Sequence, residues 1–138
     1  MNTTERRRLR KLGKFLLTVN QEQFDMASYI TPMYGTFSSG PRAAKNRLSD
    51  CGTSACAIGW AAFLFPKLAA QASYYDDLSS KLFGIDLLNY DWKFLFSEEW
   101  AKYNNSPEFA AKRISVYLEK GLPSKWLYTT AESEWKWS

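Results

Sequence analysis

Histidine is absent from this chain of 138 residues, and its absence excludes several kinds of chemistry. Without imidazole there is no Ser-His-Asp or Cys-His nucleophile, no metal site that requires a histidine ligand, and no general base of the commonest kind at neutral pH. The segment Cys51-Gly52-x-x-x-Cys56 superficially resembles a cysteine-protease nucleophile but lacks the histidine that such a site needs. We therefore expect no thiol-based catalysis.

Cysteine is also scarce. The two cysteines are too few for the disulfide framework of a small secreted domain, and no further good ligands stand at the spacing of a zinc site. A disulfide between Cys51 and Cys56 stays open in principle, although a reducing cytosol disfavours it. We expect Cys56 to be a small core residue, Cys51 to precede a helix, and the protein to bind neither a metal nor a cofactor.

Long apolar runs are missing as well. The longest, residues 55–66, is too short to span a bilayer. Near the N-terminus, Arg10, Lys11, Gly13 and Lys14 interrupt the apolar residues, so there is no signal-peptide core. These features predict an intracellular protein.

What the sequence does contain is an apolar fraction of 46% and an aromatic fraction of 17%, enough for one core in a single domain of residues 1–138. The formal net charge is +4, which weakly favours an anionic partner. Most of the excess lies near the N-terminus, in the residues Arg6, Arg7, Arg8, Arg10, Lys11 and Lys14.

Apolar spacing predicts an all-α fold, a compact helical bundle around a central hydrophobic helix of about residues 53–65. This helix should start at Gly52 and Thr53, stop at Pro66, and be surrounded by the others because it is apolar on every side. A first helix should run from Thr3 or Thr4 to about Asn20. Further helices are expected to begin near Asp76 and Asp77, at Asp86, at Ser97, and at Ser106-Pro107, the last ending at Gly121.

Two segments fall outside this helical pattern. Residues 34–50 are rich in glycine, serine and proline and predict a mobile loop. Residues 124–138 contain Trp126, Trp135 and Trp137, which are too apolar for a free tail and should dock on this chain or on a second copy. Because large exposed aromatic surfaces usually mark interfaces, we expect a homo-oligomer.

The start of the central helix is the most suggestive candidate site. Backbone N–H groups at Thr53 and Ser54, with their hydroxyls, would suit a phosphate, and loop cations stand nearby in the sequence. An aromatic face would add stacking surface for a base. The predicted ligand-binding residues are Arg42, Lys45, Arg47, Thr53, Ser54 and Trp60. Alternatively, Thr53 simply caps its own helix.

Two other interpretations use different residues. A nucleic-acid-binding module would contact phosphates through Arg6, Arg7, Arg8, Arg10 and Lys14. A small enzyme would have to rely on carboxylates alone, namely Asp76, Asp77, Asp86, Asp91, Glu98 and Glu99. Most of these acids stand at predicted helix starts, where exposed N–H groups favour them without any active site.

Several segments together resemble a family of small phage and bacterial proteins for which no activity is established. The pattern is Phe24-Asp25-Met26, then Cys51-Gly52-Thr53-x-Ala55-Cys56-x-x-Gly59-Trp60-Ala61, with Leu82-Phe83-Gly84-Ile85, Leu95-Phe96, Pro107, Ala110 and Ile114. In that family the position of Trp60 is often histidine. The resemblance implies a phage or prophage setting, and thus the cytoplasm of a bacterial host.

These observations lead to the expectation of a non-catalytic phage accessory protein that antagonises host defence. It would do so by sequestering an anionic, nucleotide-type small molecule or by binding a host protein. The alternatives are the nucleic-acid-binding module and the carboxylate-only enzyme.

Overall fold

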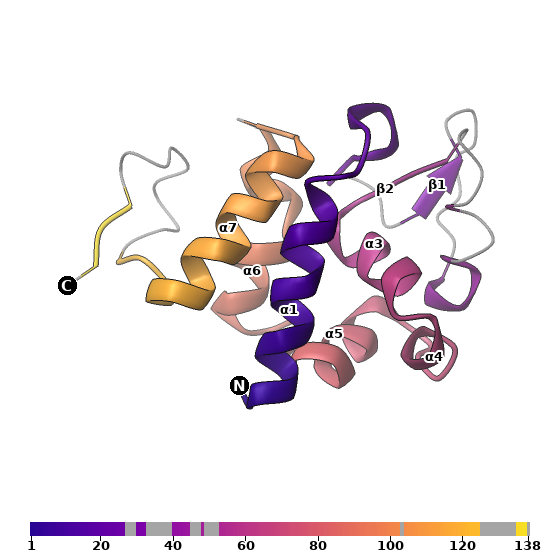
Figure 1. The fold of residues 1–138 in the computed structure, drawn as a ribbon, viewed down its shortest axis with the longest axis horizontal. Coiled ribbons are helices and arrows are strands. Elements are labelled where there is room, and N and C mark those ends of the chain that lie inside the picture. Colours follow the sequence, from indigo (N-terminus) through magenta and orange to yellow (C-terminus); the bar gives the residue numbers. More distant parts are fainter. Residues whose placement is uncertain are drawn as a thin grey trace.

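The computed structural model describes residues 1–26, 30–32, 40–44, 48, 53–102, 104–124 and 135–137. The chain is predominantly helical, as predicted (Figure 1). The α-helices are α1 (Thr3–Leu16), α3 (Ala57–Leu64), α4 (Pro66–Ala69), α5 (Tyr75–Phe83), α6 (Tyr90–Phe96) and α7 (Pro107–Lys120). Short 3-10 helices cover Gln21–Gln23, Pro41–Ala43 and Glu98–Lys102, and the strands are β1 (Ile30–Pro32) and β2 (Thr53–Ala55).

The central helix begins later than predicted. Thr53–Ala55, expected to start it, instead form β2, which pairs antiparallel with β1. The backbone N–H of Asp25 also donates to the Ala55 carbonyl at 3.0 Å, so the extended backbone of β2 has partners on other segments. The helix α3 then starts at Ala57, after Cys56, and ends just before Pro66.

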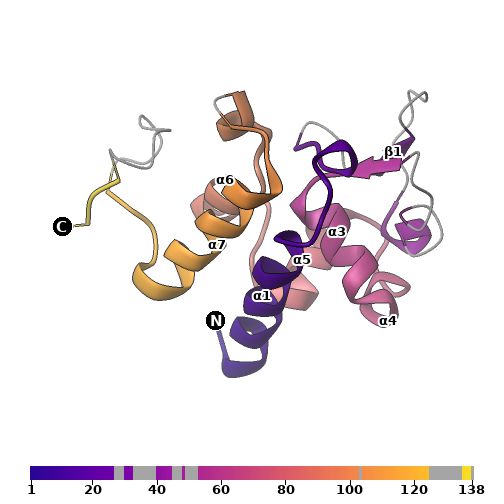
Figure 2. The same ribbon diagram turned by 45° about the horizontal axis from the view of Figure 1, so that its top comes forward.

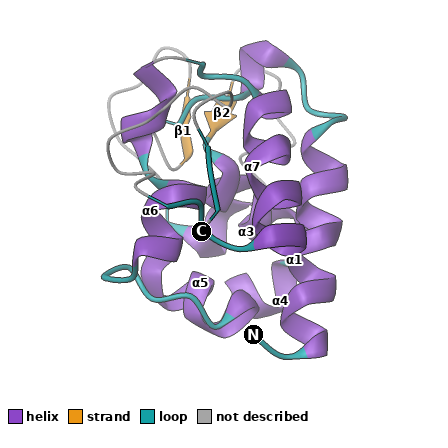
Figure 3. Cartoon of the chain, turned by 90° about the vertical axis from the view of Figure 1, so that its left-hand side faces the viewer, coloured by secondary structure: helices purple, strands orange, loops and turns teal. Residues whose placement is uncertain are grey.

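The predicted burial of this helix is largely confirmed. The α3 residues from Ala57 to Ala62 are all buried, whereas Phe63 and Leu64, at the C-terminal end of the helix, are half-buried. The two-stranded sheet precedes α3 and lies at the opposite end of the molecule from the N-terminus (Figure 3).

The helices α1 and α7 lie side by side and run antiparallel (Figures 1 and 2). Helix α1 is capped by Asn2 rather than by Thr3 or Thr4, because the Asn2 side chain accepts from the Glu5 N–H and forms a capping box. It ends at Leu16, earlier than predicted, since the chain turns at residues 17–19. Its apolar stripe, Leu9, Leu12 and Leu16, is fully buried.

Helix α7 matches its prediction closely. The Ser106 side chain accepts from the Phe109 N–H at 3.1 Å, Pro107 stands in the first turn, and Gly121 ends the helix. The predicted end of α5 at Gly84 is also correct, since Gly84 adopts a φ of +68° that glycine tolerates best.

Asp86 does not start α6 as predicted. Residues 86–89 instead form a turn in which the Asn89 N–H donates to the Asp86 carbonyl at 3.0 Å, and α6 begins at Tyr90. This turn places Leu88 at the surface, with 92% of the residue exposed.

The described part of the tryptophan-rich end docks on its own chain. Trp135 is buried against Phe94 and Phe109, and the Trp137 indole N–H donates to the Gly121 carbonyl at 3.3 Å. Trp126 lies outside the described residues. The homo-oligomer therefore stays a prediction, but Trp135 and Trp137 no longer supply its reason.

Most of the predicted mobile loop, residues 34–50, lies outside the described residues, although Pro41–Ala43 form a 3-10 helix and Leu48 is buried. Within the part of the chain that the structure describes, no helix is both long enough and apolar enough to cross a membrane.

Candidate binding groove between α1 and α7

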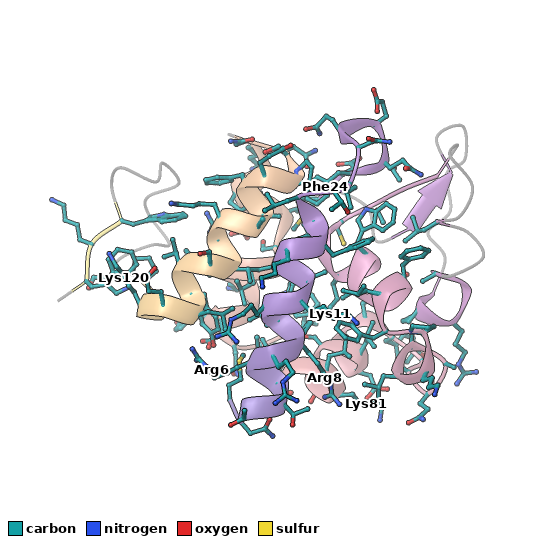
Figure 4. All side chains as sticks on the ribbon, in the orientation of Figure 1. Arg6, Arg8, Lys11, Phe24, Lys81 and Lys120 are labelled. Carbon is teal, nitrogen blue, oxygen red and sulfur yellow. The ribbon has the colours of Figure 1, made fainter. Side chains whose placement is uncertain are left out.

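The basic residues of α1 divide into two groups, and the first holds the fold together. The Arg6 guanidinium donates to the Leu118 carbonyl of α7 at 2.6 Å, and the Arg8 guanidinium donates to the Leu82 carbonyl of α5 at 3.2 Å (Figure 4). Both acceptors lie in the last turn of a helix, where carbonyls lack partners within the helix and favour a cation. Arg6 and Arg8 thus fasten α1 to two neighbouring helices.

The second group faces solvent. Arg7, Arg10 and Lys14 are exposed, and among the described residues none of them forms an ion pair or a side-chain hydrogen bond. Lys11 lies over the Phe65 ring, with 5.5 Å between its Nζ and the ring centroid. Because Arg10 and Lys14 are one helical turn apart, they share one face of α1.

That face borders an open groove of about 630 Å³ between α1 and α7. Its lining residues are Arg10, Gly13, Lys14 and Leu17 from α1 and the turn after it, with Glu108, Ala111, Lys112, Ile114, Ser115, Leu118 and Glu119 from α7. Gly13 and Ile114 meet across the helix contact, since a Cβ added at Gly13 would lie 3.1 Å from the Ile114 Cγ2. Because Gly13 has no side chain, the two helices can approach each other closely at this point.

The groove has an apolar base and charged edges. Leu17, which is 61% exposed, lines the groove just after the end of α1. Arg10 and Lys14 line the α1 side, while Glu108, Lys112 and Glu119 line the α7 side and are all exposed. On α7 these residues extend over roughly 16 Å at the usual rise of 1.5 Å per residue.

The backbone predicted to bind an anion does not form a helix start. The backbone at Thr53 and Ser54 belongs to β2, so these N–H groups do not open α3, and the geometric basis of that prediction was wrong. Lys45, Arg47 and the Thr53 side chain lie outside the described residues. Trp60 is 4% exposed and its indole N–H donates to the Gln23 carbonyl at 2.9 Å, as expected of a core residue rather than a stacking surface.

Arg42 lies elsewhere, in a second hollow. It is exposed and borders a space of about 270 Å³ together with Gly40, Pro41, Ser73 and Tyr74. Tyr74 is 72% exposed, so a cation and an open aromatic ring stand together. This hollow is smaller than the usual range of ligand pockets, about 300–1,000 Å³.

Three of the carboxylates considered for an enzyme, Asp76, Asp77 and Asp91, lie at a helix start or have a side-chain partner. Asp76 and Asp77 occupy the first turn of α5, and Asp77 pairs with Lys81 at 3.7 Å. The Tyr117 hydroxyl donates to Asp91; burial, and then this hydrogen bond, raise the pKa of Tyr117 above its ordinary value. Among the described residues, no three acidic or cysteine side chains cluster as a metal site would require.

The Cys56 thiol is buried, with 2% of the residue exposed. Burial raises the pKa of Cys56 to about 12, so the thiol is protonated at neutral pH and is a poor nucleophile. This environment fits the expected role of Cys56 as a small core residue. Cys51 lies outside the described residues.

Comparison with protein-family models, with curated proteins and with solved structures finds no match for this chain. The resemblance to small phage and bacterial proteins therefore stays a prediction, carried by the Cys-Gly-Thr segment and the residues around it.

Proposed function

We propose that this protein is a non-catalytic binding protein whose α1–α7 groove receives an amphipathic helix of a partner protein. The observation that carries the proposal is an elongated groove with an apolar base, bordered on its α1 side by two exposed cations, Arg10 and Lys14, with no partner among the described residues. Its volume of about 630 Å³ falls within the range of binding sites.

The shape of the groove favours a helix over a compact small molecule. It lies between two antiparallel helices, is open to solvent, and its lining residues extend roughly 16 Å along α7, about three helical turns. A helix that lies in such a groove uses apolar anchors at spacings of three and four residues. Leu17 and Leu118 offer the apolar contacts that such anchors need, whereas Ile114 is buried at the base of the groove.

The charges define the partner further. Arg10 and Lys14 favour acidic side chains along one edge of the partner's apolar stripe. The α7 side carries both signs, with Glu108 and Glu119 around Lys112, and so favours no strong charge there. Exposed charges of this kind contribute to specificity and association rate more than to affinity.

Under the phage setting that the sequence resemblance implies, the partner would be a host-defence protein in the bacterial cytoplasm.

A nucleotide-type ligand is the second candidate, and its support is the hollow bordered by Arg42 and Tyr74. The nucleic-acid interpretation is less favoured, because Arg6 and Arg8 are engaged with helix-terminal carbonyls.

A panel of synthetic helical peptides tests this proposal. One peptide carries an apolar stripe flanked by acidic residues, a second has the same stripe flanked by basic residues, and a third is a scrambled form of the first. We expect the first to bind about tenfold more tightly than either other peptide, measured by fluorescence anisotropy. If the scrambled peptide bound as tightly as the first, the attraction would be due to charge alone and not to the apolar stripe. If the first peptide did not bind, the proposal would be refuted.

A further inference from the structure

Arg113 is a buried cation in α7. It is 1% exposed, although arginine is among the residues that are rarely buried without a partner. Its guanidinium carbon lies 4.2 Å from the ring centroid of Phe94, 5.0 Å from that of Trp100, 5.1 Å from that of Trp135 and 5.5 Å from that of Phe109. We call these five residues the Arg113 cluster.

The cluster contains more N–H donors than acceptors. The Arg113 Nε donates to the Phe94 carbonyl at 2.5 Å. In the described part of the chain, however, the Arg113 Nη1 has no acceptor, and neither does the buried indole N–H of Trp100 or that of Trp135. Buried polar groups are nearly always hydrogen-bonded, so three unpaired donors in one cluster require an explanation.

Among the described residues, no acidic side chain forms an ion pair with Arg113. Burial lowers the pKa of Arg113 to about 9, so the side chain stays cationic at neutral pH. Aromatic faces attract a cation but offer no strong acceptor to its N–H groups. A buried charge without a partner is costly.

We propose that the Arg113 cluster binds a small monovalent anion of about the size of chloride. One negative charge would balance the single guanidinium, and the anion would accept hydrogen bonds from Nη1 and from the indole N–H groups. Because the surroundings are aromatic, a weakly hydrated halide suits the site better than fluoride or sulfate, which hold their water strongly. None of the five residues of the Arg113 cluster lines the α1–α7 groove.

Thermal unfolding in sodium salts at constant ionic strength tests the proposal. When chloride replaces fluoride, from about 5 mM to about 500 mM chloride, the Tm of the wild-type protein should rise by several degrees. Such a rise is expected when a ligand binds the folded state. Strongly hydrated anions favour folded proteins nonspecifically, so a preference for chloride cannot come from that effect. In Arg113→Met the preference for chloride should be lost, so that the Tm in chloride is no higher than in fluoride, whereas Lys102→Met, a change at an exposed cation, should keep the preference.

A second readout and a milder variant make the result decisive even if Arg113→Met fails to fold. The chlorine-35 NMR line should broaden in the presence of wild-type protein and of Lys102→Met. Trp135→Phe keeps an aromatic ring but removes one donor, and it should raise the chloride concentration at half-saturation about tenfold. Equal effects of chloride and fluoride on the wild type, or unchanged chloride affinity in Trp135→Phe, would overturn the proposal.

Discussion

Replacing Gly13 by leucine is expected to destabilise the fold by about 1–3 kcal/mol or more, because a side chain at this position enters a close-packed helix contact. A Cβ there would already lie 3.1 Å from the Ile114 Cγ2, and the remaining leucine atoms would push α1 away from α7. The groove would lose its shape at the same time. Chemical denaturation measures the loss of stability, and the acidic amphipathic peptide measures the loss of binding.

Gly40→Leu is the matched control for the Gly13 variant. Gly40 is exposed, and a Cβ there would lie 3.9 Å from the nearest heavy atom, the Ser73 carbonyl oxygen. This distance is an ordinary contact, so we expect a change in the free energy of unfolding within about 0.5 kcal/mol. A Gly13→Leu protein as stable as the wild type would show that α1 and α7 do not pack as described.

Reversing both charges on the α1 side of the groove, in Arg10→Glu with Lys14→Glu, should weaken binding of the acidic peptide about tenfold or more. Two attractions become two repulsions, and each exposed pair contributes up to about 1 kcal/mol. Binding of the basic peptide should strengthen. Fluorescence anisotropy at low and high salt measures both effects, which should shrink as salt increases.

The control for this variant is Arg7→Glu with Lys102→Glu, which makes the same change in net charge at exposed positions outside the groove. We expect it to leave peptide binding nearly unchanged at moderate salt. Both double variants should keep the Tm of the wild type, because the substituted side chains have no partners among the described residues. Equal losses in the two variants would mean that net charge, rather than the groove, drives binding.

Helix ends set by local chemistry could be predicted from the sequence. Ser106, Pro107 and Gly121 mark the ends of α7 because a cap, a fixed φ and a flexible C-terminal residue act over a few neighbouring positions. Gly84 marks the end of α5 for the same reason. Such signals need no information from distant parts of the chain.

The start of the central helix could not be predicted in this way. Gly52 and Thr53 suit a helix start locally, but residues 53–55 pair with β1, more than twenty positions earlier in the sequence. Pairing between distant segments outweighed the local preference. The predicted anion site depended on that helix start, so it lost its geometric basis together with it.

The groove and the Arg113 cluster were missed because both depend on which helices become neighbours. Gly13 looked like an interruption of an apolar pattern, whereas it is the point of closest approach to α7. Arg6 and Arg8 looked equivalent to Arg10, although their acceptors lie 112 and 74 positions away in the sequence. Arg113 did give one usable signal, since it stands four residues after Phe109 on the buried face of α7.

The most direct test of the central claim is an NMR titration of nitrogen-15-labelled protein with the acidic amphipathic peptide. We predict that the largest amide shift changes fall on residues of the α1–α7 groove, such as Gly13, Leu17 and Ser115, and that Arg10→Glu with Lys14→Glu greatly reduces them. Shift changes centred on Arg42 and Tyr74 would contradict a binding function for the groove. The absence of shift changes at a large molar excess of peptide would contradict it as well.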